Sequence, residues 1–191
     1  MISPLPAVMV TVGDMEEANI LTVAWTGILS TDPPRAYISV RPGRHSHKYL
    51  MEKGEFVINL TTEALCRTTD YVGVFTGAKV DKFEKCNLTR VASKCVSAPT
   101  ILESPLSLEC RVFQVIESGT HNIFLADILN VSCDESLLDE RGRICLERAG
   151  LIAYAHGEYY SLGKKIGNFG FSAAKPKNKK HRKPSKKQTK K

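Results

Sequence analysis

The chain has 191 residues, of which 42% are hydrophobic and 25% charged, a composition typical of one globular domain. The net charge of +7 comes from residues 173–191, which hold ten Lys or Arg and no acid, whereas residues 1–172 hold 17 basic and 20 acidic residues. The composition therefore excludes a basic nucleic-acid-binding body, and it predicts one domain over residues 1–172 with a disordered Lys-rich tail over residues 173–191.

Seven strands are predicted along the chain, where β-branched and aromatic residues cluster. Residues 110–115 alternate between apolar and polar side chains, as a half-buried strand does. The turn residues 118–120 separate the two longest strands, which predicts a hairpin. The predicted strands cover residues 8–12, 20–25, 36–41, 56–60, 108–117, 122–132 and 151–154.

Helical signals are fewer and fall between the predicted strands. Ser46 precedes a short helix that Gly54 would end, Thr62 precedes a helical run to residue 74, and Asp81 precedes a third run. Strands and helices do not alternate regularly, which argues against a parallel sheet. We therefore expect a mostly β fold, with an antiparallel sheet closed as a barrel and short helices outside it.

The six cysteines form no CxxC pair and have no histidine at the spacing of a zinc site. We expect reduced thiols, mostly buried as small core residues, in a cytoplasmic protein without a metal site. The longest apolar runs are too short to cross a bilayer, so no membrane span is expected. The cysteines are Cys66, Cys86, Cys95, Cys110, Cys133 and Cys145.

Residues 37–54 have the composition of an anion-binding site. A strand leads to Arg41, a Pro-Gly turn follows, and Arg44 and Ser46 lie at the start of the predicted helix. The start of a helix leaves backbone N–H groups unpaired, and Arg supplies forked donors, so a phosphate group would bind here. The alternative is that Ser46 caps the helix and both arginines are solvated.

Residues 23–27, VAWTG, lie where a strand ends and a stiff corner with Pro33 and Pro34 begins. Gly27 would let a ligand approach the backbone closely, and Thr26 could bond to a ring heteroatom of a flat ligand. The alternative is a turn with Trp25 in the core. The glycine-rich run 163–170 does not fit a dinucleotide-binding motif, and we expect it to be a packing segment.

Taken together, these stretches resemble the flavin reductase-like FMN-binding split-barrel family, flavoredoxin branch. The resemblance covers residues 1–172 in unbroken order. It rests on NILTVAWTGILSTDPPRAYISVRPGRHSHKYL, GEFVINL, TDYVG, GAKVDKF, LECRV, GTHNIFLADI and GLIAYAHGEYYSLGKKIGNFGFS. It implies a Greek-key split barrel of about six strands, a homodimer, and FMN bound without a covalent link near the subunit interface.

The resemblance also implies which residues bind the cofactor. The isoalloxazine would lie against Asn19, Thr22, Ala24, Trp25, Thr26 and Gly27. The ribityl phosphate would be held by Ser39, Val40, Arg41, Arg44, Ser46 and His47. The adjoining strand would contribute Asn59 and Leu60, and a loop that closes the site would contribute Gly77, Asp81 and Lys82.

The implied reaction is hydride transfer from NAD(P)H to FMN, followed by electron delivery to an acceptor. His121 and His156 are the ionisable side chains expected near the reacting rings. Many oxygenase-partner reductases of the family carry Gly-Asp-His where this chain has Gly119-Thr120-His121. Thr120 therefore favours the flavoredoxin-like members, whose electron partners vary.

Two further hypotheses remain open from the sequence. The protein could be an FMN electron carrier that a partner protein reduces, without oxidising NAD(P)H itself. It could also be a polyanion-binding module that uses its basic tail, whose attraction to phosphates would weaken with salt. Deleting residues 173–191 would abolish that attraction and leave the flavin content unchanged.

Overall fold

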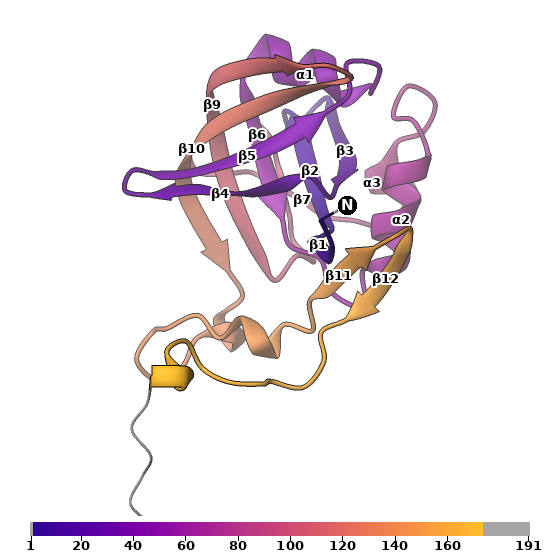
Figure 1. Cartoon of the computed structure of the whole chain (residues 1–191). Coiled ribbons are helices and arrows are strands. Elements are labelled where there is room, and N and C mark those ends of the chain that lie inside the picture. Colours follow the sequence, from indigo (N-terminus) through magenta and orange to yellow (C-terminus); the bar gives the residue numbers. More distant parts are fainter. Residues whose placement is uncertain (1, 174–191) are drawn as a thin grey trace, which may run out of the picture.

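The computed structural model describes residues 2–173 (Figure 1). Met1 and residues 174–191 lie outside the described residues, and with them nearly all of the predicted Lys-rich tail. The main feature is an antiparallel sheet of seven strands in the order β3-β2-β6-β9-β10-β5-β4. Its strands are β2 (Val8–Gly13), β3 (Ala18–Val23), β4 (Thr26–Thr31), β5 (Pro34–Val40), β6 (Glu55–Asn59), β9 (Leu106–Ser118) and β10 (His121–Cys133).

The sheet curls around one apolar core. Ile38, Phe56 and Phe124 are fully buried in its interior, and each large apolar side chain buried there stabilises the fold by roughly 1.5–3 kcal/mol. The curl brings β5 into contact with β3. The pairing of β4 with β5 extends one residue beyond β4, where the Ser39 N–H donates to the Trp25 carbonyl over 2.9 Å. The prediction of a mostly β, barrel-like fold is confirmed.

The helices pack against the barrel at its end and on its outer face (Figure 1). Helix α1 (Ser46–Lys53) buries Tyr49 and Leu50, and it ends at Gly54, whose φ of 62° lets the chain leave the helix. Helices α2 (Cys66–Val74) and α3 (Lys82–Lys85) cover β2 and β3. A second apolar core forms there from Met9, Ile20, Val72, Phe83, Leu88 and Ile101.

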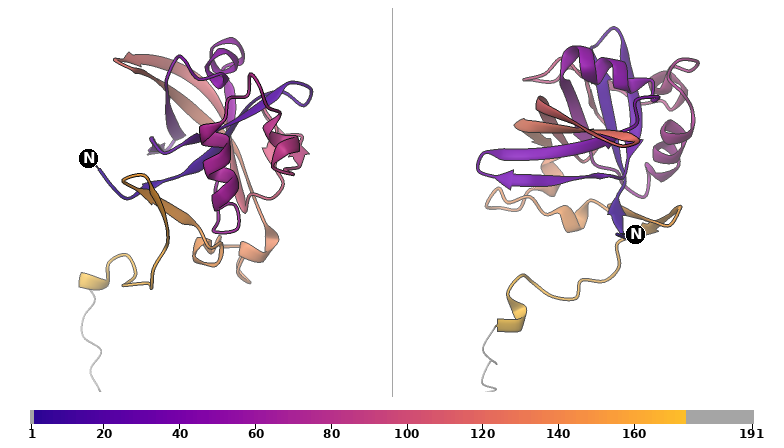
Figure 2. Two further views of the ribbon diagram at one scale, coloured as in Figure 1. Left: turned by 90° about the vertical axis from the view of Figure 1, so that its right-hand side faces the viewer. Right: turned by 45° about the horizontal axis from the view of Figure 1, so that its top comes forward.

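A three-stranded sheet lies beside the open side of the barrel (Figure 2). Its strands are β1 (Leu5–Pro6), β11 (Ile152–Ala155) and β12 (Glu158–Ser161). The Tyr159 hydroxyl of β12 donates to the Asp70 carboxylate of α2 over 3.2 Å, which ties this sheet to the barrel. The remaining elements are β7 (Arg90–Val91), β8 (Thr100–Ile101) and the 3₁₀ turns η1 (Glu135–Leu137), η2 (Leu146–Arg148) and η3 (Phe171–Ala173).

The corner predicted at Pro33 is a turn of two residues, but the prediction missed the strand that precedes it. Residues 26–40 form a hairpin, in which β4 pairs with β5 and Pro33 lies in the turn. The Thr26 hydroxyl donates to the Tyr37 carbonyl over 2.6 Å and holds the start of this hairpin. Pairing with the neighbouring strand β5 overrides the low strand propensity of Gly and Pro here.

Two predicted helix starts are also corrected. Ser46 is the first helical residue and not the cap, because His45 precedes it and makes no side-chain capping bond. The second helix begins at Cys66, since Thr62 is held by an isolated bridge to Leu151. The predicted cap Asp81 is confirmed, because its carboxylate accepts from the N–H groups of Phe83 and Glu84.

The cysteines are free thiols, as expected, but most of them do not lie in the core. Cys110 and Cys145 are buried, whereas Cys95 is exposed and the other three are partly buried. Burial raises the pKa of the Cys110 thiol to about 12, so this side chain packs as a small neutral residue. Within residues 2–173 no helix has the length and apolar character that crossing a membrane requires.

Candidate functional site

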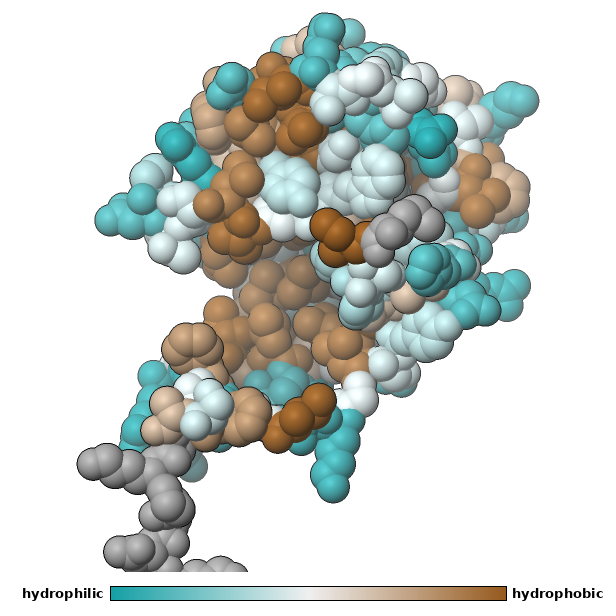
Figure 3. Space-filling model, in the orientation of Figure 1, coloured by the Kyte–Doolittle hydropathy of each residue, from teal (hydrophilic) through white to brown (hydrophobic). Residues whose placement is uncertain are grey.

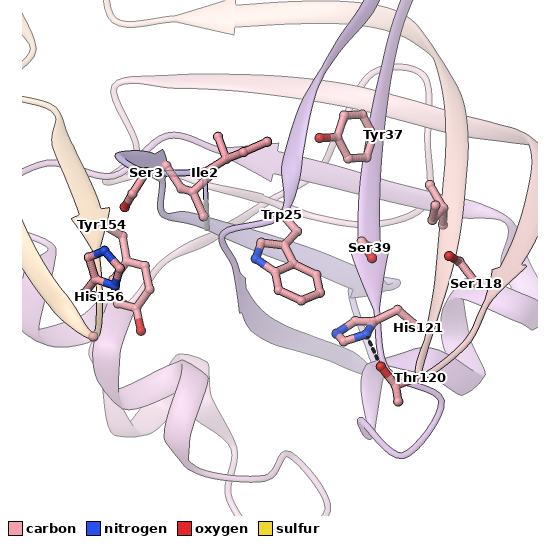
Figure 4. Close-up of a pocket in the computed structure, with 13 residues that line it drawn as sticks. Ile2, Ser3, Trp25, Tyr37, Ser39, Ser118, Thr120, His121, Tyr154 and His156 are labelled. Atoms are coloured by element: carbon pink, nitrogen blue, oxygen red, sulfur yellow. Dashed lines mark hydrogen bonds between the residues drawn. The ribbon is translucent and has the colours of Figure 1, made fainter.

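An open cavity of about 870 Å³ lies between the barrel and the three-stranded sheet. Trp25, at the link between β3 and β4, lies in its middle, with His121 on one side and Tyr154 and His156 on the other (Figure 4). Aromatic walls of this kind favour a flat, π-rich ligand. We call this space the aromatic cavity.

His121 is held in place at the start of β10. Its ring packs against Trp25 with 4.6 Å between ring centroids, and its Nδ1 lies 2.9 Å from the Thr120 hydroxyl. Burial and the nearby Arg41 lower the pKa of His121. The neutral imidazole is therefore favoured at pH 7. In this form it can donate a hydrogen bond to a ligand carbonyl or accept one from a ligand N–H.

His156 and Gly157 form the tight turn between β11 and β12. Their φ angles are 51° and 89°, as both central residues of a type I′ hairpin turn require. Such a φ is uncommon for a residue other than Gly. His156 therefore occupies a position at which glycine or asparagine would fold more easily, and its ring lines the cavity next to Tyr154 (Figure 4).

A second and much smaller cavity, of about 90 Å³, lies where β3, the start of α1 and the loop after α2 meet. Asn19, buried on β3, donates from Nδ2 to the Ser46 hydroxyl over 2.7 Å. Arg44 reaches across the same cavity and donates to the Gly73 carbonyl over 3.2 Å. We call this space the cationic cavity.

Lys82 is the most unusual side chain of the cationic cavity. It is only 5% exposed, and its ammonium donates to the carbonyls of Ile20 and Val72, each over 2.7 Å. Burial, and secondarily the charge of Arg44, lower the pKa of Lys82 to about 8. Among residues 2–173, neither Lys82 nor Arg44 forms an ion pair with a carboxylate. An anionic ligand would supply the missing counter-charge.

The predicted site residues divide between the two cavities. The aromatic cavity is lined by Trp25, Ser39, His121 and His156. The cationic cavity is lined by Asn19, Thr22, Arg44, Ser46, Gly77 and Lys82. The structure therefore brings Asn19 and Thr22, which were expected beside the ring, together with the residues expected to hold the phosphate.

Four of the predicted residues border these cavities without lining either one. Ala24 and Thr26 lie next to Trp25, and Arg41 is exposed close enough to His121 to lower its pKa. A Cβ on Gly27 would lie 3.1 Å from the Tyr37 ring, so this glycine makes room for a tyrosine of the protein.

The other predicted residues have structural partners away from both cavities. Asn59 is fully buried, and its Oδ1 accepts from the Ile101 N–H over 3.1 Å and from the Ser107 hydroxyl over 2.9 Å. Val40 lies in the apolar core, with Leu60 packed against it. His47 bonds to Asn122 over 3.1 Å, and Asp81 caps α3 and pairs with Arg90 over 2.8 Å.

Sequence analysis missed two aromatic residues of the site, Tyr37 and Tyr154. Both lie on predicted strands, and their alternation with buried neighbours was the available signal. Cys, His, Asp and Glu side chains within residues 2–173 form no cluster of three or more that could hold a metal ion.

Gly77 is expected to be essential to the geometry of the cationic cavity. A Cβ at this position would lie 2.1 Å from the Asn19 Oδ1, so Gly77→Ala would displace Asn19 and break its bond to Ser46. We expect flavin affinity, measured by fluorescence titration, to fall by about tenfold, the cost of roughly one hydrogen bond. Gly163→Ala is the control, because nothing lies within 4 Å of its Cβ and it lines neither cavity. Equal affinities for the two variants would contradict this role of Gly77.

Two solved structures are similar to this chain in fold. The chain is 31% identical to flavoredoxin of Desulfovibrio vulgaris (Miyazaki F), with a TM-score of 0.84, covering 92% of this chain and 95% of that one. A structure from Shewanella frigidimarina, described as a flavin reductase with a split barrel domain, shares the fold at 21% identity and a TM-score of 0.77, covering 86% of this chain and 84% of that one.

Two archaeal proteins described only as uncharacterized are also similar in sequence. The one from Archaeoglobus fulgidus is 35% identical over 71% of this chain and 76% of its own length. The one from Pyrococcus abyssi is 28% identical over 85% of this chain and 93% of its own length. The family described as "Flavin reductase like domain" matches residues 2–163. The chain therefore belongs to the flavin reductase-like family and has its split-barrel fold.

Proposed function

We propose that this protein binds FMN and transfers hydride from NAD(P)H to it, with electrons passing on to an acceptor. The observation that carries the proposal is a small cavity with two cations, Arg44 and Lys82, that form no ion pair within residues 2–173, together with a larger aromatic cavity. FMN has a dianionic phosphate, which suits the cationic cavity, and a flat ring, which suits the aromatic cavity. The flavoredoxin and flavin reductase neighbours support a flavin-related oxidoreductase.

In this proposal the cationic cavity holds the phosphate. Arg44 and Lys82 would donate charge-assisted hydrogen bonds to it, and the Ser46 hydroxyl, positioned by Asn19, would add a neutral one. Lys82 uses two of its three N–H groups on backbone carbonyls, which leaves one for the ligand. A cavity of about 90 Å³ suits a single phosphate group.

The isoalloxazine ring would lie in the aromatic cavity against Trp25. When bound, FMN supplies the hydride-accepting chemistry, and the chain orients the two rings and excludes competing reactions. His121, oriented by Thr120, would bond to a carbonyl or amide of the reactants. Strand β4 is an edge strand of its sheet, so N–H groups on its free side can stabilise negative charge on a neighbouring ring.

The alternative is an electron carrier that a redox partner protein reduces, and the similarity to flavoredoxin favours it. Anaerobic mixing of the flavin-loaded protein with NADH or NADPH separates the two functions. Rapid bleaching of the flavin absorbance is the result expected for the reductase. If a ferredoxin-like donor bleaches the flavin and neither NADH nor NADPH does so, the protein is an electron carrier and not a reductase.

FMN affinity should depend on pH through Lys82. Its pKa of about 8 lies below the ordinary value because its charge is buried, and a bound dianion would raise it again. The charged groups that face Lys82 are Arg44 and the titratable His45 and Cys86. The ammonium is present below pH 8 and lost above it, so we expect affinity to fall by about tenfold between about pH 7 and pH 9. A slope that Lys82→Met retains would contradict this assignment.

The proposal also includes a homodimer, which the family resemblance implies and which light scattering of the purified protein would detect. Binding of a polyanion by the tail rests on sequence alone, because residues 174–191 lie outside the described residues. A cytoplasmic location likewise stays a prediction from the sequence.

A further inference from the structure

Residues 162–173, which we call the C-terminal arm, leave large apolar side chains in solvent. Ile166 is 95% and Phe169 110% exposed, and Leu162 and Phe171 are more than half exposed. In all three views of Figures 1 and 2 the arm lies at the end of the molecule farthest from the barrel. Soluble proteins seldom expose so many neighbouring large apolar side chains unless another surface covers them.

The arm has a shape of its own, although it does not pack on the barrel. A Cβ on Gly167 would lie 2.7 Å from the Phe171 ring, so the glycine lets the chain fold back over that ring. The Phe171 N–H donates to the Asn168 carbonyl over 3.0 Å and closes the turn. We expected this glycine-rich segment to pack against the rest of its own chain. It does not do so at Gly163 and Gly170, because nothing lies within 4 Å of a Cβ at either position.

A second apolar surface lies where β10 ends and the segment with η1 and η2 begins. Figure 3 shows apolar atoms gathered in a hollow between the barrel and the segments below it. The large apolar side chains left exposed on the end of β10 and on this segment are Leu129, Val131, Leu138, Ile144 and Leu146. We call these five residues the apolar hollow.

We infer that the C-terminal arm of one copy covers the apolar hollow of a second copy, and that the two copies exchange arms about a two-fold axis. Both surfaces belong to the same chain, so an exchange about a two-fold axis covers both arms and both hollows of the dimer. The arm of the same copy stands apart from the segment with η1 and η2 in both views of Figure 2. Residues 166–173 carry no charge, which matches an apolar partner.

The area available agrees with a stable dimer. A phenylalanine buries on the order of 150–250 Å², and each arm brings two of them with Leu162 and Ile166. Two arms and the two hollows that they cover would together bury on the order of 2,000 Å², as stable dimers do. The inference rests on the proposed homodimer for its copy number but not on flavin binding.

The test uses two variants of the full chain and one control. The arm variant is Ile166→Ser with Phe169→Ser, and the hollow variant is Val131→Lys. The control is Leu102→Ser, which changes an exposed apolar residue outside both surfaces. Light scattering over a concentration series gives the dimer dissociation constant, which we expect the arm and hollow variants each to raise by at least about 100-fold and the control to leave within about threefold.

Mixing the two variants distinguishes arm exchange from a simple face-to-face dimer. A mixed dimer has one intact contact, and both changes fall on its other contact. Two changes at one contact that is already lost cost less than their sum, so an equimolar mixture should dimerise more tightly than either variant alone. Equal dissociation constants for the mixture and the separate variants, or an arm variant as tight as wild type, would overturn the arm exchange alone. A monomeric wild-type protein at tens of micromolar would overturn the homodimer as well. FMN titration would still decide the flavin proposal in either case.

Discussion

Replacing Arg44 and Lys82 together by methionine is expected to weaken FMN binding by about 10²- to 10³-fold. Each charge-assisted hydrogen bond contributes roughly 1.5–3 kcal/mol, and both cations face the cationic cavity without a carboxylate partner among residues 2–173. Riboflavin has the same ring and no phosphate, so its affinity should change by less than about threefold. Fluorescence titration of both flavins measures the two effects.

The control for this pair is Lys85→Met with Arg148→Met. It changes the net charge by the same amount at exposed positions that line neither cavity. FMN binding should stay within about threefold of wild type, because exposed charges at a distance are screened. If FMN and riboflavin weaken equally in the Arg44–Lys82 variant, the two cations contact the ring and not the phosphate.

Replacing Asn59 by alanine is expected to lower the free energy of unfolding by about 3 kcal/mol. Its Oδ1 accepts from Ile101 and Ser107, and its Nδ2 donates to the Met9 carbonyl over 3.1 Å. Each buried polar group left without a partner costs roughly 1–3 kcal/mol. Urea denaturation measures the change in the free energy of unfolding.

The same variant tests whether Asn59 belongs to the flavin site. Because Asn59 lines neither cavity, the folded Asn59→Ala protein should keep its FMN affinity. Asn168→Ala is the control, since its side chain is exposed on the arm, and it should leave the free energy of unfolding within about 0.5 kcal/mol of wild type. A stable Asn59→Ala protein that no longer binds FMN would show that Asn59 belongs to the binding site.

Much of the fold could be predicted because its signals are local. The hairpin predicted around the turn at 118–120 is confirmed by β9 and β10, and Gly54 and Asp81 mark helix ends as expected. The half-buried alternation predicted over residues 110–115 is wrong, because Phe113 and Val115 are exposed. Strand β4 could not be found in this way, because its stability comes from pairing with β5 and not from its own residues. The exposed arm was equally hidden, since its composition resembles that of a buried segment.

The candidate site was only partly predictable for a related reason. The Arg- and Ser-rich start of α1 was visible in the sequence, but Lys82 and Arg44 meet only because α3 packs against β3 beside the start of α1. Burial then gives Lys82 its lowered pKa, which no local pattern shows. The positions of Tyr37 and Tyr154 likewise depend on how the small sheet meets the barrel.

The flavin content of the purified wild-type protein tests the central claim most directly. The protein should either carry one FMN per chain or take one up from solution, with the ordinary yellow flavin spectrum and FMN released on denaturation. Mass spectrometry of the released molecule identifies it without reference to activity. A folded, colourless protein that binds FMN no better than riboflavin would contradict the claim that Arg44 and the buried Lys82 hold a flavin phosphate.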